Sequence, residues 1–189
     1  MRRNHVQTIG IAGGSGSGKT RLSLQLEEQL QPLVVKIFHM DHYYKEVRPQ
    51  SRASFTDKEY EDFNHPDAVD VHRILQDYFA AVQGQNFDVI IIEGFLLFHF
   101  PELRNTLDLK VYIDCQADER SLRRMKWFLE KGYTYDDTVA EYLDLVRYRH
   151  DQYVEPTKWF ADIIMNGATG PRKGMNMLLR WIEMKSRGM

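Results

Sequence analysis

The chain has 189 residues, of which 43% are apolar, and its formal net charge is −2. This length suits one domain with an ample core, and the near-neutral charge gives no overall attraction to nucleic acid or anionic membranes. Cys115 is the only cysteine, which excludes an intrachain disulfide, and no apolar run is long enough to cross a bilayer. We therefore expect no secretion signal and a soluble, cytoplasmic protein that binds neither nucleic acid nor membranes.

Short apolar segments rich in Val and Ile alternate along the chain with segments of helical periodicity. This pattern predicts an α/β fold in which helices flank a parallel five-stranded sheet. The expected strands are 8–12, 34–39, 88–92, 109–113 and 161–165. The expected helices are 19–31, 69–82, 117–131, 135–153 and 175–185. Two polar stretches, 45–61 and 166–173, are expected to be loops, and no repeat or linker divides the chain.

A glycine-rich segment follows the first predicted strand and matches the pattern G-x-x-x-x-G-K-[ST]. Its eight residues are Gly13, Gly14, Ser15, Gly16, Ser17, Gly18, Lys19 and Thr20. A strand before it and a helix after it are the context in which this pattern forms a phosphate-binding loop. The glycines let backbone N–H groups converge on phosphate oxygens, and the N-terminus of the helix adds a positive field. We expect Lys19 to reach the phosphates of ATP or GTP and Thr20 to hold Mg²⁺. The alternative is a flexible Gly/Ser turn.

Asp41 follows the second predicted strand by two positions. Ligands of open α/β sheets bind at the carboxyl ends of the strands, so we expect Asp41 to face the phosphate-binding loop. A carboxylate there can accept the proton of a substrate hydroxyl and help to hold Mg²⁺. The alternative is an aspartate that only initiates a turn.

Glu93 ends the third predicted strand and is followed by Gly94. An apolar strand that ends in an acid is the usual partner of a phosphate-binding loop, where the acid binds the metal or its water shell. The alternative is an acid that caps the next helix.

The predicted helix 117–131 is rich in basic residues. Arg120 and Arg124 lie four positions apart and therefore share one face. A small helical lid over approximately 119–135 would bring their guanidinium groups to the charge that develops during phosphoryl transfer. The alternative is a solvated helix face, which is the usual role of a charge run.

The seven histidines show no pattern typical of a metal site. Tyr43 is one of several aromatic residues that can stack on a planar base, with a place in the core as the alternative.

These motifs together resemble the uridine kinase branch of the phosphoribulokinase/uridine kinase family, from about residue 8 to residue 167. Besides the phosphate-binding loop, the resemblance rests on segments 41–45 (DHYYK), 63–70 (FNHPDAVD), 92–98 (IEGFLLF), 120–124 and 156–162 (PTKWFAD). It implies a P-loop kinase fold and transfer of a phosphoryl group from ATP or GTP to the 5′-hydroxyl of a ribonucleoside.

The resemblance also implies roles for individual residues. Asp41 matches the general base, Lys19 a catalytic phosphate ligand, and Thr20 and Glu93 the Mg²⁺ residues, with Asp41 in support. Arg120, Arg123 and Arg124 match residues of the lid that neutralise the transferring group. Asp41, Tyr43, Asn64, His65 and Arg124 match the acceptor site, and segment 166–173 matches the loop beside the adenine ring.

The chain departs from uridine kinases at three places. Asn64 stands where they usually have an aspartate that binds ribose hydroxyls, and only residues 84–86 separate a predicted helix from strand 88–92, where they carry a base-reading hairpin. A further arginine of the uridine kinase lid corresponds to residues 126–127, where this chain has none. That phosphate contact is therefore lost or replaced by Lys126 or Lys131. Nicotinamide riboside kinases are similar to this chain in the shortened region and in segment 91–98.

Several acceptors and one other class of function remain open on the sequence alone. The acceptor could be a pyrimidine nucleoside, nicotinamide riboside, pantothenate or a sugar phosphate. A nucleotide-dependent switch or adaptor is the alternative class, although the chain has neither an N-K-x-D guanine reader nor an L-S-G-G-Q-type signature. Both a monomer and an oligomer are compatible with the composition.

Overall fold

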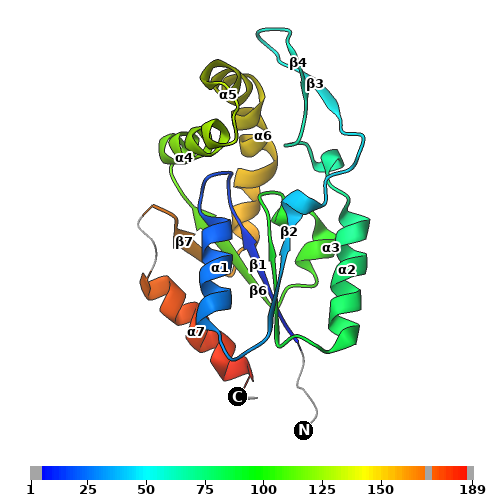
Figure 1. Cartoon of the computed structure of the whole chain (residues 1–189), viewed down its shortest axis with the longest axis vertical. Helices are drawn as coiled ribbons and strands as arrows, with labels where there is room; N and C mark the ends of the chain where they lie inside the picture. The colour runs from blue at the N-terminus through cyan, green and yellow to red at the C-terminus, as the bar shows by residue number, and fades with distance from the viewer. Residues whose placement is uncertain (1–5, 169–171, 187–189) are drawn as a thin grey trace.

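The computed structural model describes residues 6–168 and 172–186. Its centre is a parallel five-stranded sheet with strand order β2-β5-β1-β6-β7 and helices on both faces (Figure 1). The strands are β1 (Gln7–Ala12), β2 (Val35–His39), β5 (Val89–Glu93), β6 (Leu109–Asp114) and β7 (Ile163–Asn166). The helices are α1 (Lys19–Gln29), α2 (Val71–Gly84), α3 (Pro101–Arg104), α4 (Ala117–Glu130), α5 (Tyr135–Glu141), α6 (Arg147–Arg149) and α7 (Arg172–Ser186).

Two apolar clusters cover the two faces of the sheet. Successive side chains of a strand point to opposite faces, so Val89 and Ile91 pack with α1 and α7 while Ile90 and Ile92 pack with α2 and α3. All four side chains are fully buried. This two-sided burial explains why the strands read as unbroken apolar runs, and each such side chain contributes about 1.5–3 kcal/mol to stability.

The predicted α/β fold with a parallel five-stranded sheet is confirmed, and the boundaries of its strands and of α1, α2, α4 and α7 lie within three residues of the predicted ones. Segment 45–61 is not only a loop, because it contains a hairpin formed by β3 (Gln50–Arg52) and β4 (Glu59–Glu61). The hairpin escaped prediction since its strands are short and lack an apolar face. The connection between α2 and β5, residues 85–88, is short and contains no hairpin, as expected.

The expected helix 135–153 is continuous in direction but irregular in its hydrogen bonding. Two π-helical stretches, Tyr142–Val146 and His150–Val154, flank α6. We call residues 142–154 the π segment. Together with α4 and α5 it rises above the carboxyl ends of the strands, and the β3–β4 hairpin rises on the other side (Figure 1). In the described part of the chain, no helix has the length and apolarity needed to span a membrane.

Candidate active site

The phosphate-binding loop connects β1 to α1 and is tightly enclosed. Gly13, Gly16 and Gly18 have φ angles of 139°, 80° and 101°, in the region that favours glycine. A Cβ on Gly14 would lie 2.6 Å from Arg120 Nη1 and 2.9 Å from His150 Cε1, so these two side chains approach the loop closely. The loop is therefore bounded by α4 on one side and by the π segment on the other.

Lys19, the first residue of α1, is buried within this loop. Its Nζ donates a hydrogen bond of 3.1 Å to the Gly14 carbonyl. Burial lowers the pKa of Lys19, and Arg120 acts in the same direction, while the charges of Glu93 and Asp41 oppose the shift. The lysine thus lies in the electric field of both carboxylates that the sequence assigned to the site.

Glu93 connects three elements at the carboxyl end of the sheet. Its Oε1 accepts a hydrogen bond of 2.9 Å from Thr20 Oγ1 and lies 2.7 Å from His39 Nδ1. The contact with His39 follows from the strand register, which pairs His39 with Glu93 across β2 and β5. The sequence prediction missed His39, although its position as the last residue of a neighbouring strand could have revealed it.

The oxygen pair of Thr20 and Glu93 fits Mg²⁺. This cation prefers oxygen ligands and takes only one or two protein groups, with phosphates and waters completing its coordination. Among the described residues, no group of three or more His, Cys, Asp or Glu side chains is arranged as a metal site. A hydroxyl and a carboxylate 2.9 Å apart beside the loop are thus the donor set expected for a metal that arrives with a polyphosphate.

Asp41 lies on the 3₁₀ turn Met40–His42 that follows β2. Solvent reaches its carboxylate, yet the surrounding protein reduces its hydration, and this loss raises the pKa of Asp41. The charge of Lys19 opposes the rise and that of Glu93 adds to it. Burial and then the neighbouring Asp41 raise the pKa of the Tyr44 hydroxyl. Asp41, Lys19 and Glu93 therefore share one electrostatic neighbourhood near the carboxyl ends of β1, β2 and β5.

Arg120 and Arg124 of α4 are both buried. Arg120 Nε donates to the Cys115 carbonyl at 2.9 Å, which leaves its Nη1 beside Gly14. Arg124 Nη2 donates to Glu141 Oε2 at 3.0 Å, and its guanidinium lies 4.2 Å from the Phe128 ring centroid. Its Nη1 is buried without a hydrogen-bond partner among the described residues. A buried donor of this kind is costly unless a ligand supplies the acceptor.

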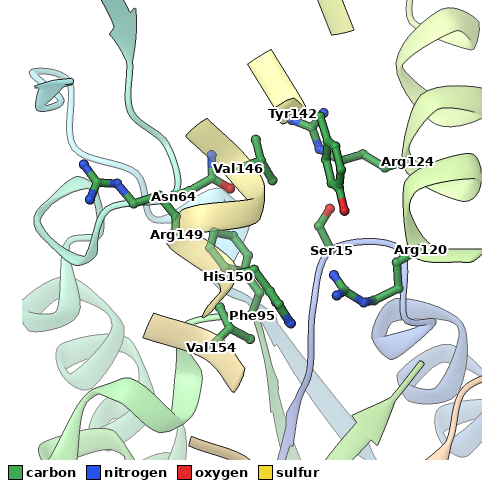
Figure 2. A pocket seen from close by; sticks show the side chains of 10 residues that line it. All are labelled: Ser15, Asn64, Phe95, Arg120, Arg124, Tyr142, Val146, Arg149, His150 and Val154. Atoms are coloured by element: carbon green, nitrogen blue, oxygen red, sulfur yellow. The ribbon is translucent and has the colours of Figure 1, made fainter. Parts of the chain in front are cut away.

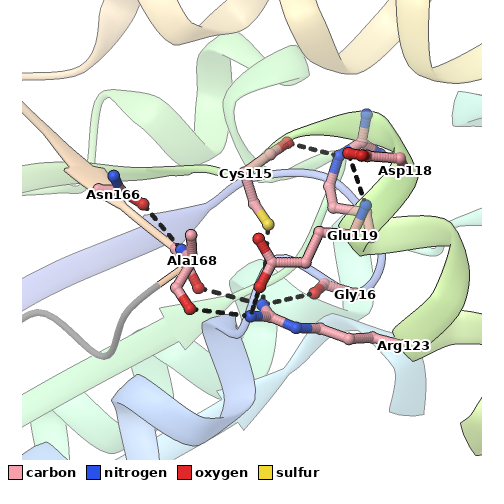
Figure 3. A network of polar contacts seen from close by, with 9 residues as sticks. Gly16, Cys115, Asp118, Glu119, Arg123, Asn166 and Ala168 are labelled. Carbon is pink, nitrogen blue, oxygen red and sulfur yellow. Dashed lines mark hydrogen bonds and ion pairs between the residues drawn. The ribbon is translucent and has the colours of Figure 1, made fainter.

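Arg123 has a different environment from its neighbours (Figure 3). Its Nη1 donates to the Gly167 carbonyl at 3.0 Å and to the Gly16 carbonyl at 3.3 Å, and its Nη2 donates to the Ala168 carbonyl at 3.2 Å. An ion pair with Glu119 completes the cluster. Arg123 therefore ties the chain after β7 to the phosphate-binding loop, and it does not join Arg120 and Arg124 as the prediction expected. Of the expected adenine-side loop 166–173, residues 169–171 lie outside the described residues.

A hollow lies between the phosphate-binding loop and the π segment (Figure 2). Ser15, Asn64 and Phe95 line it from three loops, and Arg120 and Arg124 line it from α4. The π segment contributes its remaining wall through Tyr142, Val146, Arg149, His150 and Val154. The hollow is therefore open to both the phosphate-binding loop and the predicted acceptor side.

Three residues expected to bind the acceptor, Asp41, Tyr43 and His65, do not line the hollow. Tyr43 is a core residue whose hydroxyl donates to Asp77 Oδ2 at 2.8 Å; burial, followed by this bond, raises its pKa to about 12. His65 Nδ1 accepts from the Asp67 amide at 3.1 Å, and its ring packs on Tyr153. Tyr43 turns into the core because the strand preceding it ends in a 3₁₀ turn, and His65 instead caps the short helix Pro66–Ala68.

The sequence prediction also missed the wall formed by the π segment. Tyr142, Val146, His150 and Val154 recur every fourth residue, and this spacing could have identified a common face. Burial, followed by the charge of Arg120, lowers the pKa of His150 to about 4, so its imidazole is neutral at neutral pH. The proposed substitutes for a further lid arginine, Lys126 and Lys131, do not line the hollow.

Comparisons with known proteins show which family the chain resembles. A family model described as "Phosphoribulokinase / Uridine kinase family" matches residues 8–87 and 80–170. A protein named uridine kinase from Geobacillus kaustophilus is 34% identical over 193 aligned positions, which cover 90% of this chain and 88% of the relative. One with the same name from Anoxybacillus flavithermus is 36% identical over 188 positions, covering 87% of each.

Solved structures share the fold at lower sequence identity. A possible uridine kinase from Bacillus stearothermophilus superposes with a TM-score of 0.52 at 24% identity, covering 87% of this chain and 91% of that chain. A putative fructose transport system kinase from Silicibacter sp. TM1040 gives a TM-score of 0.56 at 19% identity, with the same coverage.

Proposed function

Because the chain belongs to the phosphoribulokinase/uridine kinase family, we propose that it is a kinase that transfers the γ-phosphoryl group of ATP to the 5′-hydroxyl of a ribonucleoside. The observation that carries this proposal is the convergence of Lys19, the Thr20–Glu93 pair and Asp41 at the carboxyl end of the sheet, next to the phosphate-binding loop. Its relatives named uridine kinase support a nucleoside as the acceptor.

The donor side of the reaction is built by the phosphate-binding loop. Its backbone N–H groups and Lys19 hold the polyphosphate, and Arg120 and Arg124 face the hollow from α4. Thr20 and Glu93 would hold Mg²⁺, which neutralises phosphate charge when it is bound. The unpartnered Nη1 of Arg124 gains an acceptor when the negative charge of a phosphoryl group enters the hollow.

Asp41 is the general base of this proposal. It accepts the proton of the acceptor hydroxyl as that oxygen bonds to phosphorus and the bond between the γ-phosphorus and the bridging oxygen breaks. The raised pKa of Asp41 lies closer to neutral pH than that of an ordinary aspartate, and this makes the carboxylate a better proton acceptor. A general base of this kind typically contributes about 10²–10⁴-fold to the rate. We further propose that segment 119–135 acts as a lid of the single kinase domain, since α4 carries the two arginines that border the phosphate-binding loop.

Asn64 is positioned to orient the sugar because its side chain lines the hollow (Figure 2). An amide can both donate to and accept from ribose hydroxyls, without the charge of an aspartate. The short connection between α2 and β5 favours nicotinamide riboside as a second candidate acceptor, because it leaves no base-reading hairpin at that place. Pantothenate and sugar phosphates rank below both, and a switch or adaptor function leaves Asp41 without a role.

The proposal is tested by measuring ADP release with Mg²⁺ and either ATP or GTP. The acceptors are uridine, cytidine, nicotinamide riboside, pantothenate and a sugar phosphate. We expect turnover with at least one nucleoside and about 10²-fold or greater loss in Asp41→Asn, whose circular dichroism spectrum should match that of the wild type. Equal turnover by the two proteins would reject Asp41 as the base, and triphosphate hydrolysis that no acceptor affects would favour the switch instead.

A further inference from the structure

We infer that Arg149 is a positioning residue for the acceptor. It fixes the position of Asn64 through the buried Asp62, and this inference rests on the proposed function. Asp62 is fully buried, and its Oδ2 accepts hydrogen bonds from Arg149 Nε at 2.8 Å and from Ser51 Oγ at 2.7 Å. Arg149 Nη2 also donates to Ser51 Oγ at 2.9 Å. Three distant segments, β3, the chain after β4, and α6, therefore meet at one carboxylate.

The other oxygen of Asp62 extends this contact to the hollow. Asp62 Oδ1 accepts a hydrogen bond of 2.9 Å from the backbone amide of Asn64. Asn64 is itself one of the residues that line the hollow. Because a single carboxylate binds Arg149 with one oxygen and the Asn64 backbone with the other, the place of Asn64 depends on α6. We call Arg149, Asp62 and Ser51 the acceptor tether.

Arg149 acts through other residues. Its Nε and Nη2 serve the tether, and its Nη1 donates to Gln152 Oε1 at 3.0 Å. Figure 2 shows its guanidinium pointing away from the hollow. Each of the three nitrogens therefore donates a hydrogen bond to protein, and the effect of Arg149 on the acceptor passes through Asp62 in this inference.

Burial makes the tether sensitive to the loss of its cation. A buried carboxylate that loses its charged partner is strongly destabilised, so the chain around it rearranges or takes up a proton. The hairpin has a separate link to the π segment, because Thr56 Oγ1 and Tyr60 Oη both donate to Asp144 Oδ2 at 2.7 Å. Without Arg149 we therefore expect the hairpin to stay attached while Asn64 loses its fixed position.

The test is steady-state kinetics of Arg149→Met with the acceptor and ATP varied separately. We expect the KM for the acceptor to rise about tenfold or more, while the KM for ATP and kcat change less than threefold. Arg149→Lys keeps the positive charge and one donor, so its acceptor KM should lie between those of Arg149→Met and the wild type. An unchanged acceptor KM, or a parallel rise in the KM for ATP, would overturn the inference.

Two further variants separate the tether from a general loss of stability. Arg147→Met is the matched control, because Arg147 is exposed on the same helix and donates to the Tyr148 hydroxyl. We expect its kinetics to equal those of the wild type. The double variant Arg149→Met with Asp62→Asn has no buried carboxylate without a cationic partner. Its KM for the acceptor should therefore be lower than that of Arg149→Met alone. Additive effects of the two substitutions would contradict the tether.

An experiment without substrates distinguishes failure of the tether from failure of the proposed function. Hydrogen exchange of the backbone amide of Asn64, measured by NMR, should be faster in Arg149→Met than in the wild type. In Arg147→Met it should equal that of the wild type. If the wild type phosphorylated no acceptor, the proposed function would fail and this exchange result would still decide the tether. Unchanged exchange at Asn64 in Arg149→Met would reject the tether whatever the activity.

Discussion

Replacing Glu93 by Gln removes a charge from the centre of the site while keeping its shape. Both recorded contacts of Glu93, from Thr20 Oγ1 and with His39 Nδ1, use Oε1, and the carbonyl oxygen of a glutamine can take the same place. Charge-assisted hydrogen bonds contribute about 1.5–3 kcal/mol each and neutral ones about 0.5–1.5 kcal/mol, so the variant should lose about 1–3 kcal/mol of unfolding free energy and stay folded.

The effect on catalysis should be larger than the effect on stability. Loss of one electrostatic group of an active site typically lowers kcat about 10²–10³-fold, and the Mg²⁺ concentration for half-maximal rate should rise as well. The charge of Glu93 raises the pKa of Asp41 and that of Lys19. Removing this charge lowers both pKa values. A base must be deprotonated and the lysine protonated, so both limbs of the pH–rate profile should move to lower pH.

The assay is ADP release as a function of pH and of Mg²⁺ concentration, with Glu61→Gln as the control. Glu61 pairs with Arg48 at 2.7 Å on the hairpin and does not line the hollow. The control should keep the pH profile and the Mg²⁺ requirement of the wild type. A Glu93→Gln profile that stays in place or moves to higher pH, or an unchanged Mg²⁺ requirement, would refute the reasoning.

Four other substitutions test individual features of the site. Arg124→Met should lower kcat about 10²-fold with only a small fall in melting temperature, because removal of a buried donor that lacks a partner offsets part of the lost ion pair with Glu141. Gly14→Ala should weaken ATP binding in calorimetry about tenfold or more, since its Cβ, 2.6 Å from Arg120 Nη1, would displace the guanidinium group that borders the loop. Tyr43→Phe should cost about 0.5–1.5 kcal/mol in urea unfolding, because it removes one hydrogen bond to Asp77, which is exposed to water, with kcat unchanged. His150 has a pKa of about 4 in the folded state, below its ordinary value of 6.5, so protons favour unfolding and stability falls as pH drops from 6.5 to 4. His150→Gln should flatten this fall, and an equally steep fall would contradict the assignment.

The elements that carry strong periodicity could be predicted from the sequence. The strand around Ile91 and the helix around Leu26 are fixed by local apolar patterns and were placed to within a few residues. The Gly13–Thr20 loop and Glu93 could also be placed, because parallel strands bring their carboxyl ends to one edge. The hairpin β3–β4 could not, since long-range contacts hold it, such as those of Thr56 and Tyr60 with Asp144.

The directions of individual side chains were harder to predict than the elements. Arg123 and Arg124 are neighbours in sequence, yet one binds backbone carbonyls and the other faces the hollow, because adjacent residues on a helix point about 100° apart. Tyr43 follows Asp41 by two positions but turns into the core after the 3₁₀ turn. The spacing could indicate that His150 shares a face with Tyr142, Val146 and Val154. Only the fold shows that this face, and Arg149 with it, lies across from the phosphate-binding loop.

The most direct measurement is phosphorus NMR of the product formed from ATP, Mg²⁺ and a ribonucleoside, with uridine and nicotinamide riboside tried in parallel. The account predicts a new phosphomonoester signal, coupled to the 5′-methylene protons of one nucleoside, that grows in step with ADP and is nearly absent with Asp41→Asn. Inorganic phosphate as the sole new product besides ADP, with either nucleoside, would contradict it.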